Sequence, residues 1–216
     1  LLIVILLPAC TPKLTAPTPE IIETVESDRK IAVNPDTENK IYMATDGATY
    51  NNVFYTGVNS TLNKYMLTSE EETIEPTPLC PNPLCMHNDK YCPLYLIGDV
   101  FILDEAESIK NNNAPIFYFI GIDGIKRYDS ATNESKIIYK VEGFGISTIW
   151  LYGEHFYFTV SDGKEYMARR IDKNGKNEVT VTPEISDSSY RFFGFDEKYA
   201  YCSNSMSNVY RIDFDK

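Results

Sequence analysis

Ile116-Phe-Tyr-Phe-Ile120, Gly121-Ile-Asp-Gly124 and Ile125-Lys-Arg-Tyr-Asp129 follow one another without a break and predict a β-hairpin. Two runs of aromatic and branched residues flank a turn that contains two glycines, which is typical of antiparallel strands joined by a tight turn. The Asp that ends the second run can hydrogen-bond its own backbone two residues on and start another turn. The stretch therefore predicts strand, turn, strand, turn.

The same layout recurs along the chain. Its four copies are Asn52–Tyr55 with Lys64–Leu67, Ile116–Ile120 with Ile125–Asp129, His155–Val160 with Ala168–Asp172, and Lys198–Cys202 with Val209–Asp213. Further strands are expected at Lys136–Tyr139, Thr148–Leu151, Glu178–Val181 and Tyr190–Phe193. Asn174-Gly175 supplies the positive φ values that a tight hairpin requires.

The spacing of the copies predicts the architecture. The aromatic residues Phe117, Phe156 and Tyr199 lie about 40 residues apart, which is the spacing of four-stranded blades. We therefore expect an all-β fold, a β-propeller with about four blades visible, the last one incomplete, interrupted by a Cys-rich loop. A β-sandwich with irregular hairpins is the alternative.

Composition supports strands and argues against two classes of partner. The 216 residues include 16 Tyr and 11 Phe, residues that favour strands, and the length allows one sizeable core. The formal net charge is −11. Nucleic-acid binding needs clustered Lys and Arg, so we expect no nucleic-acid partner, and no basic patch for anionic lipid.

The first residues indicate export. Leu1–Leu7 is too short to span a bilayer but suits the apolar region of a signal peptide. The chain does not begin with Met and stops within a repeat at Val209–Lys216, so we expect a fragment at both ends. Leu7-Pro8-Ala9-Cys10 resembles the lipobox of bacterial lipoproteins, which implies lipidation of Cys10; an ordinary secretory cleavage site is the alternative.

Three regions follow from these patterns. Residues 1–10 are expected to be the signal-peptide remnant and lipobox, and residues 11–36 a proline-rich tether. Residues 37–216 are expected to form the propeller blades, with the Cys-rich insertion at about 76–95. This organisation predicts a protein anchored to a bacterial cell membrane by lipid and facing outside.

The insertion gathers Cys80, Cys85, His87 and Cys92 into thirteen residues. Three thiolates and one imidazole suit a tetrahedral soft-metal site such as structural zinc, in which four protein ligands leave no open catalytic position. Cys85 and His87 are two residues apart, so in an extended segment their side chains point the same way. A disulfide is the alternative, because an exported chain sits where disulfides persist. Cys202 lies in a strand pattern, which favours a small buried residue over a bridge partner.

Local composition predicts how the loop is shaped. A turn at Asn88-Asp89 would return Cys92 towards the other ligands. Prolines stiffen the loop and would order the ligands in advance; they are Pro76, Pro78, Pro81, Pro83 and Pro93.

The loop also carries a family resemblance. Pro78-Leu-Cys80-Pro-Asn-Pro-Leu-Cys85-Met-His87-Asn-Asp-Lys-Tyr-Cys92-Pro93 resembles a stretch in uncharacterised exported lipoproteins of Gram-positive anaerobes. The resemblance implies a β-propeller related to TolB-like and domain-of-unknown-function propellers, with this loop after the first blade. It implies a fold and a location rather than an activity.

The sequence offers no convincing catalytic set. His155 reads as an exposed turn residue, and the acids Asp104, Glu105 and Glu107 read as a solvated loop. We therefore favour a surface binding module for a glycan, peptide or partner protein over an enzyme. The alternative is a propeller-based hydrolase or lyase whose catalytic residues lie in blades outside this fragment.

Overall fold

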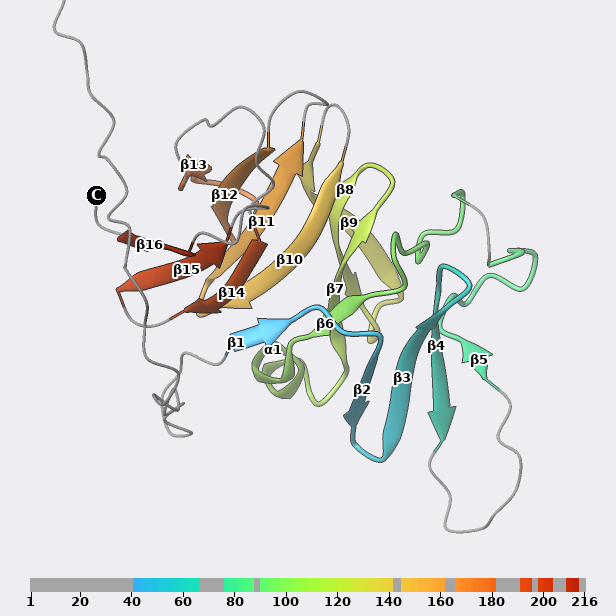
Figure 1. Ribbon diagram of the computed structural model, residues 1–216. Coiled ribbons are helices and arrows are strands. Elements are labelled where there is room, and N and C mark those ends of the chain that lie inside the picture. Colours follow the sequence, from blue (N-terminus) through green and yellow to red (C-terminus); the bar gives the residue numbers. More distant parts are fainter. Residues whose placement is uncertain are drawn as a thin grey trace, which may run out of the picture.

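The computed structural model describes residues 41–66, 76–87, 90–141, 145–161, 166–181, 191–195, 198–203 and 209–213. In these ranges the chain is all-β, with four antiparallel sheets and one short helix (Figure 1). The expected lipobox at Cys10, the tether and the Asn88-Asp89 turn lie outside the described residues.

The four sheets follow one another along the chain as meanders of consecutive strands, except that the third sheet also includes β1 (Ile41–Met43) from the start of the described chain. The first sheet contains β2 (Gly47–Tyr50), β3 (Val53–Val58), β4 (Thr61–Met66) and β5 (Thr77–Pro78). The second contains β6 (Phe101–Leu103), β7 (Ile116–Gly121), β8 (Gly124–Asp129) and β9 (Glu134–Lys140). The third contains β10 (Ile146–Tyr152), β11 (His155–Ser161), β12 (Tyr166–Asp172) and β13 (Val179–Thr180), and the fourth contains β14 (Arg191–Phe195), β15 (Tyr199–Ser203) and β16 (Val209–Asp213).

The first sheet differs from the expected pattern at its turns. Asn59 and Ser60 both have positive φ, 52° and 61°, and form a two-residue turn between β3 and β4. The strand after this turn therefore begins at Thr61 rather than at Lys64. Asn51 and Asn52 form the same kind of turn before β3, with φ of 49° and 60°. Asn tolerates the left-handed region, so these hairpins need no glycine.

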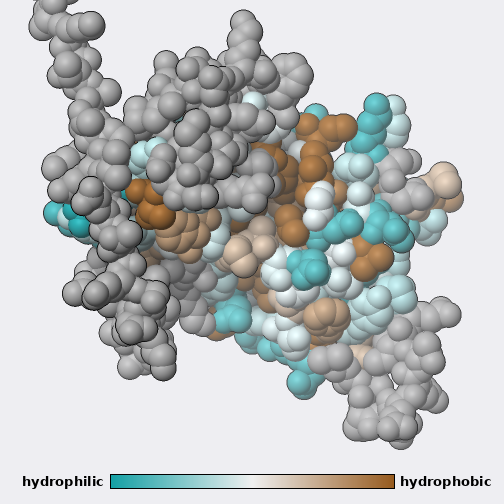
Figure 2. All heavy atoms as spheres, in the orientation of Figure 1, coloured by the Kyte–Doolittle hydropathy of each residue, from teal (hydrophilic) through white to brown (hydrophobic). Residues whose placement is uncertain are grey.

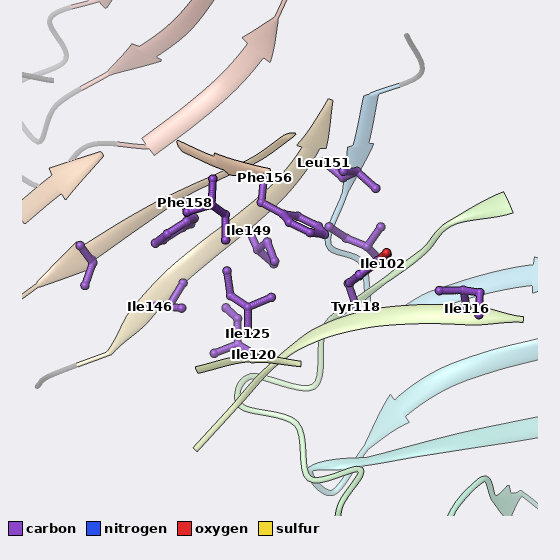
Figure 3. Packing of buried hydrophobic residues seen from close by; sticks show 12 residues of the cluster. Ile102, Ile116, Tyr118, Ile120, Ile125, Ile146, Ile149, Leu151, Phe156 and Phe158 are labelled. Carbon is purple, nitrogen blue, oxygen red and sulfur yellow. The ribbon is translucent and has the colours of Figure 1, made fainter. Parts of the chain in front are cut away.

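Strand β7 shows how the sheets pack, because all six of its residues are buried. Successive strand residues point to opposite faces. Phe117 therefore faces the first sheet, where its ring meets that of Tyr55 at 5.0 Å between centroids. Tyr118 faces the third sheet, where its ring meets that of Phe156 at 4.7 Å (Figure 3). A strand buried on both faces places the second sheet between two neighbours.

Each pair of consecutive sheets encloses an apolar cluster. The first and second sheets enclose Tyr55, Leu62, Phe101, Phe117 and Tyr128; the second and third enclose Ile102, Tyr118, Ile125, Phe156 and Phe158; the third and fourth enclose Trp150, Tyr157, Phe192, Phe195 and Ala200. On the face shown in Figure 2, hydrophobic and hydrophilic residues are interspersed. The core therefore lies between the sheets rather than in one central layer.

A short early segment joins two of these sheets. Strand β1 (Ile41–Met43) pairs with β10 of the third sheet. Two residues on, Thr45 and Phe101 of β6 exchange backbone hydrogen bonds of 2.8 and 2.9 Å. Residues 41–45 therefore tie the first strands of the second and third sheets together before the chain enters β2. Nothing in the sequence of this three-residue strand predicted it.

A second tie runs through a turn between β12 and β13. Gly175 has φ of 75°, and a Cβ at this position would overlap the carbonyl oxygen of Ile138 in β9. The third sheet thus touches the second sheet backbone to backbone. A turn closes with a hydrogen bond of 2.9 Å from Gly175 N–H to the Asp172 carbonyl, but the expected pair of positive φ values at Asn174-Gly175 is wrong: Gly175 and Asn177 have positive φ, Asn174 does not, and residues 173–178 join the two strands. In the part of the chain that the structure describes, no helix is long and apolar enough to cross a bilayer.

Gly98 and Gly175 have similar positive φ values, but only Gly175 has neighbouring atoms that an added Cβ would meet. Comparing alanine variants of the two therefore distinguishes the cost of positive φ from the cost of a steric clash. Gly98 has φ of 78°, but no atom lies within 4 Å of a Cβ built there. We expect Gly98→Ala to lower the free energy of unfolding by about 1 kcal/mol, the cost of a left-handed alanine. Gly175→Ala should cost about 2 kcal/mol more, because backbone must move. Urea denaturation of both variants measures the difference, and equal losses would contradict the close contact with Ile138.

Candidate functional site

The Cys-rich loop is wedged between the first and second sheets. Leu79 N–H donates to the Leu62 carbonyl at 2.9 Å, and Leu96 N–H donates to the Ser60 carbonyl at 2.8 Å, so both ends attach to the first sheet. Leu94 and Leu96 are fully buried in the cluster between the two sheets. The loop is therefore part of the core, although Leu84, Met86 and Tyr91 of the same segment are exposed.

The second sheet holds the loop from the other side. The Tyr128 hydroxyl lies 3.3 Å from the Leu79 carbonyl and 2.9 Å from Asn133 Oδ1, between which its one proton is shared, and the Ser135 hydroxyl donates to the Pro93 carbonyl at 3.1 Å. Burial, with the neighbouring Cys80, raises the pKa of Tyr128 to about 12. Tyr128 therefore remains a neutral hydrogen-bond donor at physiological pH.

The loop brings together the four residues that the sequence singled out. The ligand atoms of Cys80, Cys85, His87 and Cys92 all lie within 4.8 Å of one another, and all three cysteines are free thiols. Zinc–sulfur bonds of about 2.3 Å in a tetrahedron place sulfur atoms about 3.8 Å apart. The four side chains can therefore hold a metal ion with small adjustments.

The backbone reaches this arrangement by a different route from the one expected. His87 has φ of 62°, and its N–H donates to the sulfur of Cys85 at 3.4 Å. A turn at Asn82 precedes it, with the Asn82 side chain accepting from Leu84 N–H at 3.0 Å. The prediction of an extended segment between Cys85 and His87 was therefore wrong. A tight turn, rather than strand alternation, points both side chains inward.

Two features of the cluster suit a cation. Nδ1 of His87 is buried and makes no hydrogen bond within the described ranges, although a buried imidazole nitrogen ordinarily has a partner. Burial, together with hydrogen bonding to Cys85 and the neighbouring Cys80, raises the pKa of Cys92 to about 12. Three thiolates could not coexist here without a compensating positive charge, and a divalent cation would supply it.

The remaining cysteine and histidine lie elsewhere. Cys202 is fully buried in β15, opposite Phe192 and Tyr210, and burial raises its pKa to about 12. Its interpretation as a small core residue is confirmed. His155 is the first residue of β11 and is half-buried rather than exposed in a turn; burial and the nearby Arg170 lower its pKa.

A second site lies where the sequence predicted a solvated acidic loop, and that prediction was wrong. Helix α1 (Glu105–Lys110) connects β6 to β7, and the carboxylate of Asp104 caps it by accepting from Glu107 N–H at 3.0 Å. Asp104 is 0% exposed and pairs with Lys173 Nζ at 2.8 Å. Lys173 follows β12 in the third sheet, so no local sequence pattern could have revealed the pair.

Around this ion pair the second and third sheets form an open polar pocket of about 520 Å³. Its lining residues are Glu107, Lys110, Asn111, Tyr118, Arg127, Lys136, Glu154, Lys173 and Asn174. Most of its groups are fixed by one another. Glu107 Oε2 accepts from the Tyr118 hydroxyl at 2.9 Å and from Arg127 Nε at 3.4 Å. Asp129 pairs with Arg127 Nη1 at 3.4 Å and accepts from the Asn111 amide at 2.9 Å.

The hydroxyl of Tyr118 in this pocket is not activated as a nucleophile. Burial and the carboxylate of Glu107 raise the pKa of Tyr118, so its hydroxyl stays protonated. Glu107 already accepts hydrogen bonds and lies 3.8 Å from Lys173 Nζ. These contacts hold the donors of Tyr118 and Arg127 in place.

Comparisons of the sequence with family models and curated proteins, and of the structure with solved structures, found no match.

The Asp104–Lys173 pair predicts a large and separable effect on stability. Lys173→Met leaves the Asp104 carboxylate buried without a cation, which should lower the free energy of unfolding by about 3–5 kcal/mol. Adding Asp104→Asn removes the stranded charge and keeps a helix-capping oxygen, so the double variant should recover most of that loss. Chemical denaturation of the single and the double variant measures the loss of stability and its recovery. A double variant no more stable than Lys173→Met alone would contradict the pairing.

Proposed function

We propose that this chain is an exported, lipid-anchored binding module built on a β-propeller scaffold, with a zinc ion fastening its inserted loop. The observation that carries the binding role is the polar pocket between the second and third sheets, most of whose groups are held in place by one another. A ligand site of a few hundred Å³ with few, fixed polar groups is typical of small-molecule recognition.

Sheet order supports the propeller. Strands β2 to β5, β6 to β9, β10 to β13 and β14 to β16 each run in chain order, with β1 added beside β10, and each sheet packs against the next through its own apolar cluster. Successive four-stranded meanders stacked face to face are the building units of propeller blades. A β-sandwich would instead bury one core between two sheets.

The zinc proposal rests on the donor set. Thiolate and imidazole ligands favour zinc among common divalent ions, and four protein ligands produce a closed structural site. Such an ion would clip the loop whose buried leucines fill the space between the first two sheets. The proposed lipid on Cys10 and the outward-facing location rest on the sequence motif alone.

Metal analysis tests the clip. We expect one zinc per purified chain, and loss of that zinc in Cys85→Ser with a fall in melting temperature of about 5–10 °C, corresponding to about 2–3 kcal/mol. Cys202→Ala is the matched control, because it removes a thiol remote from the cluster and should leave the zinc content unchanged. A wild-type chain without metal and with two fewer titratable thiols would show a disulfide instead.

Ligand arrays test the binding role. The purified chain should bind members of a glycan or peptide array without converting them, and Glu107→Gln should weaken the binding because Glu107 positions Tyr118 and Arg127. Lys64→Gln, on an exposed face of β4, should bind as the wild type does. Turnover of a bound compound, or the absence of any bound member, would contradict a binding module.

A further inference from the structure

The pocket between the second and third sheets has more unused donors than acceptors. Arg127 uses Nε on Glu107 and Nη1 on Asp129, which leaves part of its five-donor guanidinium available. The ammonium groups of Lys110 and Lys136 make no hydrogen bond or ion pair with any described residue. Of the two carboxylates in the lining, Glu107 accepts from Tyr118 and Arg127, and the exposed Glu154 lies 3.7 Å from Lys173 Nζ.

The basic residues in the pocket lining also favour an anionic ligand. The chain carries a net charge of −11, yet the pocket lining gathers Lys110, Arg127, Lys136 and Lys173. Asp104 and, at 3.7 Å, Glu154 pair with Lys173, and Glu107 and Asp129 hold Arg127. These four carboxylates face Lys173 and Arg127, whereas Lys110 and Lys136 make no ion pair with any residue that the structure describes. An anionic ligand would supply their counter-ion.

We propose that this pocket binds a small sugar that carries an oxyanion, either a carboxylate or a phosphate; this inference rests on the binding role proposed above. The planar Arg127 fork matches the paired oxygens of a carboxylate or phosphate. The polar lining favours a hydroxylated ligand over an apolar one. Because Glu107 already fixes Tyr118 and Arg127, binding requires little ordering of these side chains.

Calorimetric titration of the purified, metal-loaded chain tests the ligand class. The probes are D-glucuronate, D-glucose 6-phosphate and D-glucose, each at low and at physiological salt. We expect one of the two anions to bind at least ten-fold more tightly than glucose, with affinity falling as salt rises. The better anion identifies carboxylate or phosphate as the recognised group.

Three variants locate the binding. Arg127→Gln should weaken the better anion at least ten-fold. Since Arg127 also supports the fold, the exposed double variant Lys110→Gln/Lys136→Gln provides a second measurement and should weaken it at least three-fold with an unchanged melting temperature. Lys64→Gln removes an equivalent charge on the first sheet and should bind as the wild type does.

Each contrary outcome overturns the inference. Equal binding of glucose and the anions would remove the oxyanion requirement and leave the binding role intact. Failure of both anions to bind at 10 mM, while an array ligand binds, would remove only the ligand class. Failure here and on the arrays would remove both proposals. Anion binding that both Arg127→Gln and Lys110→Gln/Lys136→Gln retain would place the bound anion outside the pocket.

Discussion

Burial of aromatic strands on both of their faces is the constraint on which this structure depends. A strand such as β7, with all six residues buried, cannot be covered by one neighbouring sheet. Phe117 needs the first sheet and Tyr118 needs the third, so the sheets must stack in chain order. The same requirement leaves a seam between neighbouring sheets, and the Cys-rich loop and the polar pocket each occupy such a seam.

The hairpins were predictable because their signals are local. Alternating aromatic residues, glycine turns and terminal Asp residues identified β7 with β8 and β11 with β12 within one or two residues. Strands β1 and β6 were missed because each is only three residues long, and β1 in addition pairs with a strand about one hundred residues away. The Asn59–Ser60 turn was missed because the usual glycine is replaced by residues that tolerate positive φ.

The two sites differ in the same way. The thiol–imidazole cluster was visible in the sequence because its four ligands fall within thirteen residues and have distinctive chemistry. Its backbone geometry was not, since a positive φ at His87 replaces the expected extended segment. The polar pocket was invisible, because Asp104 and Lys173 meet across two sheets from positions 69 residues apart. The role of the acidic stretch at Asp104 becomes clear only once the fold places Lys173 beside it.

The tie formed by residues 41–45 also constrains the order in which the molecule can be completed. Strand β1 pairs with β10, so it cannot pair until about one hundred further residues have been synthesised. A chain that emerges N-terminus first would therefore hold this segment unpaired while its hairpins form one by one. Contacts between such distant residues slow folding, because a long loop must close before they form. The first strand of the structure would then be among the last to take its place.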